Sequence, residues 1–376
     1  MNNRIVITEY NNKIVVQFIK DNEAVKIRAL NDSGEMADTV YLGRISTVKP
    51  NINSSFVRFN GRKGFIGNTK RKPETLFPVM IKKETPGNKE DEVTDIITLC
   101  GLYTIVGNGI NGISFSRRID ANYKKENEEQ LTTKLNNCII RQNAASASTD
   151  SVIAEYNYLS NMLDRINSIA DKRTDNAILY NGISKLVSLV FTENITEYDE
   201  ILTDDIKTFE ILKNFISTYD EYGIEIPIAV KFYEDKTLPL KPFVSFTSKL
   251  EKATSKKVYL KSDAYLCFDY TEAMNVIDVN SGTTVYKGNK EDVIHKINLE
   301  AIVETARQIK LRNLSGIIIV DLINEKSKEN YDELIKVMRD LLKDDECHAK
   351  CHDITKLGLM EITRSRIEKT LREELY

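Results

Sequence analysis

The chain has 376 residues, 41% hydrophobic and 29% charged, a composition typical of a globular protein of two to four modules. Its sequence contains no run approaching the roughly 20 apolar residues of a membrane span, and residues 1–10 lack the apolar core of a signal peptide. Five cysteines in so long a chain make no disulfide framework, which favours a reducing, cytoplasmic setting. The net charge of −3 excludes a globally basic protein, so nucleic-acid binding would have to come from local patches.

Short β patterns dominate the first 106 residues. Apolar runs at 4–8 and 13–18 flank the turn signal Asn11–Asn12 and predict a hairpin. Five further strand patterns follow, separated by Gly and Asn turns, at 39–48, 54–59, 63–66, 79–83 and 102–106. Short strands at this spacing predict a small β-barrel.

The middle of the chain has a helical period. Residues 121–136, 149–170 and 207–219 are charged and helical in pattern, and 140–141 is a short strand candidate between the first two. Strand patterns return at 257–279.

The clearest unit is a β-α-β-α segment. Residues 274–280 predict a strand, and 290–311 predict a helix with an apolar stripe and Asn289 as its N-cap. A second strand at 317–322 and a helix at about 330–342 follow. The two strands should therefore be parallel, with a right-handed crossover.

Both of these strands carry a carboxylate near their carboxyl end. Asp278 and Asn280 are two residues apart and so face the same way, and Asp321 interrupts the second apolar run. If the strands are neighbours, the two carboxylates lie close together and need a cation. Oxygen ligands in an open cleft suit Mg²⁺ or Mn²⁺, which would polarise a phosphate and activate water. A lone Asp at a strand end is usually a loop or cap residue, so the prediction depends on the pair.

At these residues the chain resembles the catalytic region of the ribonuclease E/G family. Three segments carry the resemblance: SDAYLCFDYTEAMNVIDVNSG at 262–282, NLEAIVETARQIKLRNLSGIIIVDL at 298–322 and LGLMEITRSR at 357–366. Weaker matches run earlier, in the family's order: LGRISTVKP at 42–50, FVRFNGRKGFI at 56–66, GNK at 87–89 and SRR at 116–118.

The resemblance implies a multidomain α+β and α/β fold. Residues 1–38 and 188–255 would form a ribonuclease-H-like body. An OB-fold β-barrel at 39–100 and a helical 5′-sensor region at 101–187 would be inserted into it. A deoxyribonuclease-I-like α/β catalytic subdomain would occupy 256–376.

The resemblance also implies an activity and its metal site. The family's members are Mg²⁺-dependent endoribonucleases that cleave single-stranded, AU-rich RNA by attack of metal-activated water. They leave a 5′ phosphate and a 3′ hydroxyl, and they act in rRNA processing and mRNA decay in the cytoplasm. Asp278 and Asp321 match the two metal-binding carboxylates, and Asn280 matches an Asn that hydrogen-bonds the site.

Two further groups of residues match RNA-contacting positions of the family. In the barrel, these are the stacking aromatics Phe56 and Phe65 and the backbone-contacting lysines Lys83 and Lys89. In the pocket that senses the RNA's 5′ phosphate, they are Gly101, Ile105, Arg141 and the adjacent Gln142.

The composition of the barrel region agrees with RNA binding. Residues 58–83 hold eight Lys and Arg against one acid, with Phe56, Phe59 and Phe65 interleaved. Basic grooves with aromatic platforms bind single strands. The alternative is that the phenylalanines fill the barrel core and the basic residues form a solvated face.

The chain departs from the family pattern at several positions. Gln142 follows Arg141 where the family has Thr, and His348 stands near a family Arg, which puts 5′-end sensing in doubt. The family's zinc-binding Cys-x-x-Cys segment and small dimerisation domain would follow Arg366, whereas the chain ends at Tyr376. We therefore expect no zinc, and any homodimer would lack the family's zinc link.

Other signals leave alternatives open. Residues 347–352 hold two Cys and two His, which could bind a metal as a helical turn but not as an extended strand. His348 and His352 could also form an acid/base pair in a metal-independent ribonuclease. The G-x-G-x-x-G pattern at 107–112 predicts a hairpin loop, since no helix follows it. The rival from another class is a non-catalytic OB-fold RNA-binding protein, against which the intact Asp278, Asn280 and Asp321 argue.

Overall fold

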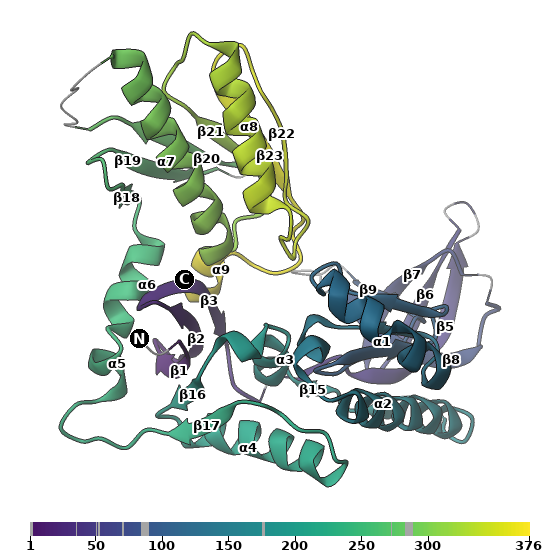
Figure 1. Cartoon of the computed structure of the whole chain (residues 1–376). Helices are drawn as coiled ribbons and strands as arrows, with labels where there is room; N and C mark the ends of the chain where they lie inside the picture. Colours follow the sequence, from purple (N-terminus) through teal and green to yellow (C-terminus); the bar gives the residue numbers. More distant parts are fainter. Residues whose placement is uncertain are drawn as a thin grey trace. The chain divides into compact units, whose positions relative to one another are not determined.

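The computed structural model describes residues 3–34, 36–49, 51, 53–69, 71–83, 90–174, 177–271, 273–282 and 289–376. The chain forms two compact units (Figure 1). The first contains residues 1–31, 200–205 and 231–376, and the second contains 32–199 and 206–230. Among the described helices, none combines the length and apolar character that a bilayer crossing requires.

The first unit begins with a five-stranded sheet in the order β17-β16-β1-β2-β3. The predicted hairpin is confirmed: β1 and β2 pair antiparallel, and Asn11 and Asn12 take the positive φ angles, 51° and 59°, of a tight turn. Its strands are β1 (Arg4–Tyr10), β2 (Lys13–Lys20), β3 (Glu23–Leu30), β16 (Glu200–Thr203) and β17 (Ala229–Phe232). Helices α5 (Leu240–Phe243), α6 (Phe246–Thr254) and α9 (Leu371–Leu375) share a hydrophobic core with this sheet.

A six-stranded sheet forms the rest of the first unit, in the order β18-β19-β20-β21-β23-β22. Its strands are β18 (Lys257–Tyr259), β19 (Tyr265–Tyr270), β20 (Met274–Asn280), β21 (Gly316–Asp321), β22 (Lys350–Ile354) and β23 (Leu359–Arg364). The predicted β-α-β-α order is confirmed, with α7 (Lys290–Leu311) joining the parallel strands β20 and β21 and α8 (Lys328–Leu342) following.

One face of this sheet is buried by the two helices. The Asn289 side chain caps α7 by accepting a hydrogen bond from the Glu291 N–H, as predicted. The apolar stripe of α7 packs with α8 and with alternate strand residues such as Ile277 and Val320, both 0% exposed. The strand positions between them project to the opposite face, which carries Asp278, Asn280 and Asp321 beside apolar residues such as Val276 and Ile319.

The second unit contains a closed barrel of five strands, as predicted from its short β patterns. The strands pair in the order β5-β6-β7-β9-β8, and β5 pairs with β8 to close the barrel. They are β5 (Val40–Lys49), β6 (Ser54–Phe59), β7 (Arg62–Gly67), β8 (Leu76–Lys83) and β9 (Asp91–Thr94). Apolar side chains including Ile45, Val57 and Phe59 fill the interior, so the barrel is OB-like and has its own core.

The prediction of the fifth barrel strand was wrong. Residues 102–106 overlap β11 (Thr104–Gly107), which lies in a separate sheet of order β10-β11-β13-β12. The fifth barrel strand is β9, which was not predicted because its sequence, DEVT, is acidic and Asp and Glu are depleted in strands. Val93 packs in the barrel core, and Asp91 on the same face accepts a hydrogen bond from Arg62. Glu92, on the opposite face, accepts a hydrogen bond from Lys82, so both faces of the strand have partners.

The four-stranded sheet also corrects the interpretation of the glycine-rich segment. Its strands are β10 (Thr98–Cys100), β11, β12 (Ile113–Phe115) and β13 (Cys138–Ile140). Both β11 and β12 pair with β13, one antiparallel and one parallel, so residues 107–112 are not a hairpin loop.

The helices of the second unit follow the predicted ranges closely. The three predicted helices are α1 (Ala121–Lys134), α2 (Thr149–Ala170) and α4 (Ile206–Glu221). The remaining elements are short: β4 (Met36–Ala37), η2 (Gln142–Ser146), β14 (Ile178–Tyr180), β15 (Ile183–Ser184), α3 (Lys185–Phe191) and η3 (Ile195–Glu197).

Candidate active site

Two carboxylates lie opposite each other on the face of the six-stranded sheet that the helices leave open. In the parallel pairing of β20 and β21, Asp278 is the register partner of Asp321. Their neighbours Ile277 and Val320 point into the core, so both carboxylates point to the face that the helices leave open. The sequence predicted that the two strands are parallel, and the structure shows that they are also neighbours, the condition under which the two carboxylates were expected to lie close together.

The electrostatics of the pair suit a cation. The Asp278 carboxylate accepts a hydrogen bond of 2.6 Å from the Asn280 amide, which fixes its orientation. Partial desolvation and the neighbouring Asp278 charge raise the pKa of Asp321. A hard divalent ion would relieve this repulsion, and Mg²⁺ binds through one or two carboxylates, completing its shell with water and phosphate oxygens. Among the described residues, no group of three or more His, Cys, Asp and Glu side chains could hold a metal ion.

The segment after Asp321 is held by a side chain that sequence reasoning did not single out. Asn298, fully buried on α7, donates to the Ile323 carbonyl at 2.7 Å and accepts from the Ile323 N–H at 3.0 Å. Its amide also donates to the Glu325 carboxylate at 2.7 Å. Asn298 begins the NLEA motif, so the sequence could have singled it out, but the sequence does not show that its partner is the Ile323 backbone.

His295 contacts the same carboxylate. Its Nδ1 lies 3.0 Å from Glu325 and its Nε2 lies 3.2 Å from Glu333. His295 is thus held between two glutamates.

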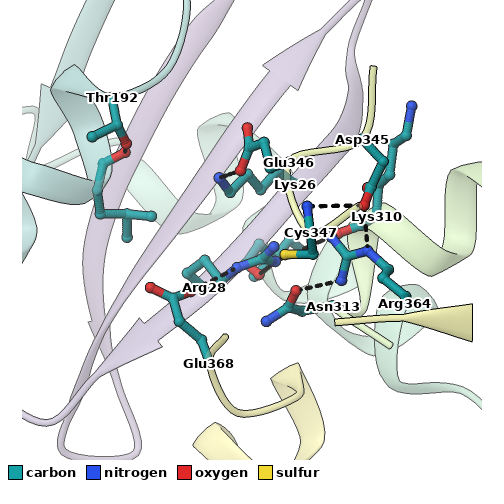
Figure 2. Close-up of polar contacts among 12 residues, drawn as sticks. Lys26, Arg28, Thr192, Lys310, Asn313, Asp345, Glu346, Cys347, Arg364 and Glu368 are labelled. Carbon is teal, nitrogen blue, oxygen red and sulfur yellow. Dashed lines mark hydrogen bonds and ion pairs between the residues drawn. The ribbon is translucent and has the colours of Figure 1, made fainter. Parts of the chain in front are cut away.

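The turn that carries His348 is held by a buried ion pair (Figure 2). The Asp345 carboxylate accepts hydrogen bonds from the N–H groups of Cys347 and Ala349, which flank His348. It also lies 2.9 Å from the Arg364 guanidinium, and both side chains are at most 3% exposed. His348 itself has a φ of 55°, a left-handed conformation that this network stabilises.

The other signals in this segment do not form a site. Cys347 and Cys351 are buried, and burial raises the pKa of both thiols, in the case of Cys351 to about 11. The His352 ring lies 2.7 Å from the Thr363 hydroxyl. Only residues 350–354 form the extended strand β22, whereas Cys347 and His348 lie in the turn before it, and the two Cys and two His make no metal-binding group in the described part of the chain.

In the barrel, two of the three phenylalanines lie outside the core. Phe56 and Phe65 are cross-strand partners with ring centroids 6.3 Å apart, and both are half-buried. The Lys63 ammonium lies 4.3 Å from the centroid of the Phe56 ring. Phe59 is fully buried in the core, so for this residue the structural alternative holds.

The charge of the barrel is less positive than residues 58–83 suggested. When the count is extended to residues 58–95, the segment 90–95 adds four acids and Glu84 and Lys89 cancel, so the excess of positive charge falls from seven to three. Three barrel cations, Arg62, Lys63 and Lys82, form ion pairs with Asp91, Glu90 and Glu92 respectively. The side chain of Lys83 and the whole of Lys89 lie outside the described residues.

The predicted sensor residues are partly brought together. The Arg141 guanidinium donates to the carbonyls of Gly101 and Thr192, and its backbone N–H donates to Tyr103. Ile105 lies on β11 opposite Cys100, and Gln142 begins the short helix η2. The structure therefore joins Gly101 to Arg141, while the roles of all four residues stay predictions.

A buried glutamate organises this region and was missed by the sequence analysis. The Glu155 carboxylate on α2 accepts hydrogen bonds from the N–H groups of Leu102, Tyr103 and Thr104 and from the Thr104 hydroxyl. Burial raises the pKa of Glu155, which is fully enclosed. A Cβ at Gly101 would meet its carboxylate oxygens at 2.6 Å, so only glycine fits there.

Comparison with known proteins agrees with the resemblance. A model described as the ribonuclease E/G family matches residues 98–367. Ribonuclease E of Synechocystis sp. is 25% identical over 395 residues, which cover 99% of this chain and 58% of that protein. Ribonuclease E of Nostoc sp. is 25% identical over 356 residues, covering 89% of this chain and 52% of that protein. Ribonuclease G of Escherichia coli is 26% identical over 365 residues, covering 89% of this chain and 74% of that protein. The chain thus spans little more than half the length of the two ribonuclease E relatives.

Proposed function

Because the chain belongs to the ribonuclease E/G family, we propose that it is an endoribonuclease whose metal site is the pair Asp278 and Asp321. The single observation that carries the proposal is the register of β20 and β21, which places these two carboxylates side by side on the open face of the sheet. The proposed substrate is single-stranded, AU-rich RNA, and the proposed products carry a 5′ phosphate and a 3′ hydroxyl. The proposed setting is RNA processing and decay in the cytoplasm.

The residues present fit Mg²⁺, with Mn²⁺ as the alternative, and no zinc is needed in this proposal. Asp278 and Asp321 would hold the ion, which when bound supplies a Lewis acid for the phosphate and acidifies water. Asn280 orients Asp278 through its 2.6 Å hydrogen bond. Asn298 holds the segment that follows Asp321, so the second carboxylate stays in register with the first.

The barrel would bind the RNA strand. Phe56 and Phe65 are half-buried aromatic side chains on the outer surface, with the Lys63 ammonium over one ring, which is the combination that stacks bases and attracts phosphates. The resemblance adds Lys83 and Lys89 as backbone contacts.

We propose the family's domain names for four segments of the chain. Residues 39–100 would be the OB-fold domain and 101–187 the 5′-sensor region. Residues 1–38 and 188–255 would be the ribonuclease-H-like body, and 256–376 the deoxyribonuclease-I-like subdomain.

We propose that 5′-end sensing is weak. Arg141 already donates to two backbone carbonyls, and Gln142 stands where the family has a compact hydroxyl. His348 stands near a family Arg, and an imidazole cannot form the bidentate phosphate contact of a guanidinium. Loss of one charge-assisted hydrogen bond, worth about 1.5–3 kcal/mol, would reduce the preference for a 5′ monophosphate by roughly ten- to a hundredfold. Initial rates on oligonucleotides that differ only at the 5′ end measure this preference.

The decisive experiment compares metal-site variants with a matched carboxylate. Asp278→Asn and Asp321→Asn should abolish Mg²⁺-dependent cleavage of an unstructured AU-rich oligonucleotide while retaining RNA binding in EDTA. Asp269→Asn is the control. Asp269 is an exposed carboxylate on β19, and its 2.6 Å ion pair with Lys256 contributes little to the free energy of unfolding. Wild-type turnover in either metal-site variant would overturn the assignment. Binding without any cleavage by the wild-type protein would favour the rival, a non-catalytic RNA-binding protein.

A further inference from the structure

The open face of the six-stranded sheet extends beyond the two carboxylates, towards the edge strand β18. Along β19, Leu266 and Phe268 point into the core, so Tyr265 and Cys267 project to the open face. On β18, Lys257 and Tyr259 are both exposed on the same side. The polar face next to the metal-site candidates therefore carries two tyrosines and a lysine.

The strand register relates these side chains to the candidate site. Tyr259 pairs with Tyr265, and Tyr265 pairs with Asn280, which gives one row of side chains across three strands. Neighbouring strands are about 4.8 Å apart, so Tyr265 lies one strand spacing from Asn280 and Tyr259 lies two. A base extends from its phosphate over a comparable distance, so a nucleotide held at the carboxylates would reach this row.

The two tyrosines and the lysine contact one another. The rings of Tyr259 and Tyr265 have centroids 5.8 Å apart and an interplanar angle of 53°. The Lys257 ammonium lies 4.6 Å from the centroid of the Tyr265 ring. Tyr259 is 72% exposed and so contributes little to the hydrophobic core. Aromatic faces beside a cation are the groups that bind unpaired bases and the adjoining phosphates of single-stranded RNA.

We propose that Tyr259 and Tyr265, together with Lys257, form a stacking site for one unpaired nucleobase of the RNA, next to the scissile phosphate. This inference rests on the proposed function, because it takes the phosphate to lie at the two carboxylates. It assigns to the catalytic subdomain a base contact separate from the barrel phenylalanines. The alternative is a purely structural role, in which the lysine and the two tyrosines cover the edge strand β18.

The test removes the base and the ring independently. An oligonucleotide cleaved at one site is prepared with an abasic ribose at each position flanking the scissile phosphate. For wild-type protein, one such position should lower kcat/KM by roughly 5- to 150-fold, the range of one base–aromatic stack. In a Tyr259→Leu, Tyr265→Leu double variant, kcat/KM on the intact oligonucleotide should fall by the same factor. Removing the base at that position should then lower the double variant's kcat/KM little further. Tyr265→Phe keeps the ring and should retain the wild-type response.

The control is Tyr222→Leu, because Tyr222 is 54% exposed and its ring lies 4.4 Å from that of Tyr158 in the second unit. It should leave kcat/KM on every oligonucleotide unchanged. Melting temperatures of the variants establish that they fold. If the double variant matches Tyr222→Leu, or loses the same factor on intact and abasic oligonucleotides alike, the stacking site is overturned while the endoribonuclease function stands. If wild-type protein does not cleave, the proposed function fails. The stacking site is then tested by measuring the affinity of the same variants for the intact and abasic oligonucleotides in EDTA by fluorescence anisotropy.

Discussion

Asn298 offers the sharpest perturbation of the candidate site, because it touches no proposed metal ligand yet holds the segment next to one. Its amide makes two hydrogen bonds with the Ile323 backbone, two residues after Asp321, and a third with the Glu325 carboxylate. Asn298→Ala removes all three and leaves the backbone groups of Ile323 without this partner in the interior. The substitution should therefore lower stability and let Asp321 move relative to Asp278.

The magnitude follows from the hydrogen bonds. Two neutral bonds are worth about 1 kcal/mol each, and a bond to a carboxylate about 1.5–3 kcal/mol. The side chains of Asn298 and Glu325 are almost fully enclosed, so solvent screening does not reduce these values much. The free energy of unfolding should fall by about 3–5 kcal/mol. A displacement of roughly 1 Å at a catalytic group can cost about a hundredfold in rate, so kcat should fall by roughly 10- to 100-fold.

Urea unfolding measures the stability, and cleavage rates over a Mg²⁺ titration measure the site. A merely structural role would lower the fraction of folded protein, whereas a positioning role also raises the Mg²⁺ concentration needed for half-maximal rate. The matched control is Thr305→Val on the same helix. The Thr305 hydroxyl is buried and has no hydrogen-bond partner among the described residues, so its removal should be neutral or stabilising. If Asn298→Ala behaves like Thr305→Val in both assays, the reasoning is refuted.

Three further predictions concern stability. Burial raises the pKa of Glu374 from 4.5 to about 7, so its contribution is fully present below pH 4.5 and is lost as pH rises through 7. Relative to Glu374→Gln, the wild-type protein should lose about 3 kcal/mol over this range in urea unfolding, and a pH-independent difference would contradict this. Gly101→Ala should cost about 1–3 kcal/mol by overpacking against Glu155, whereas Gly67→Ala, whose Cβ meets no described atom within 4 Å, should leave the melting temperature unchanged. Asp345→Ala leaves its arginine partner charged and buried and should cost about 3–5 kcal/mol, so a loss under about 1 kcal/mol would show that the ion pair is not needed.

The sequence by itself determined the local elements around the candidate site. The pattern from Met274 to Asn280 predicted a strand that ends in Asp278 and Asn280, and the 3.6-residue stripe after Asn289 predicted a helix, and both elements are present. The positions of Asp278 and Asp321 near the ends of two strands singled them out, and the family resemblance agreed with that choice. These features are readable because periodicity, capping and motif spacing are properties of neighbouring residues in the chain.

Only the tertiary structure decided which distant residues meet. The pairing of Asp278 with Asp321, the contact of Asn298 with Ile323, and the burial of Glu155 against three backbone N–H groups each join residues more than 20 positions apart. The acidic strand β9 was not predicted, because the cations that pair with its carboxylates lie on other barrel strands. These carboxylates also reduce the positive charge of the barrel. Such contacts depend on strand register and on the packing of whole elements, and local propensity does not specify either of these.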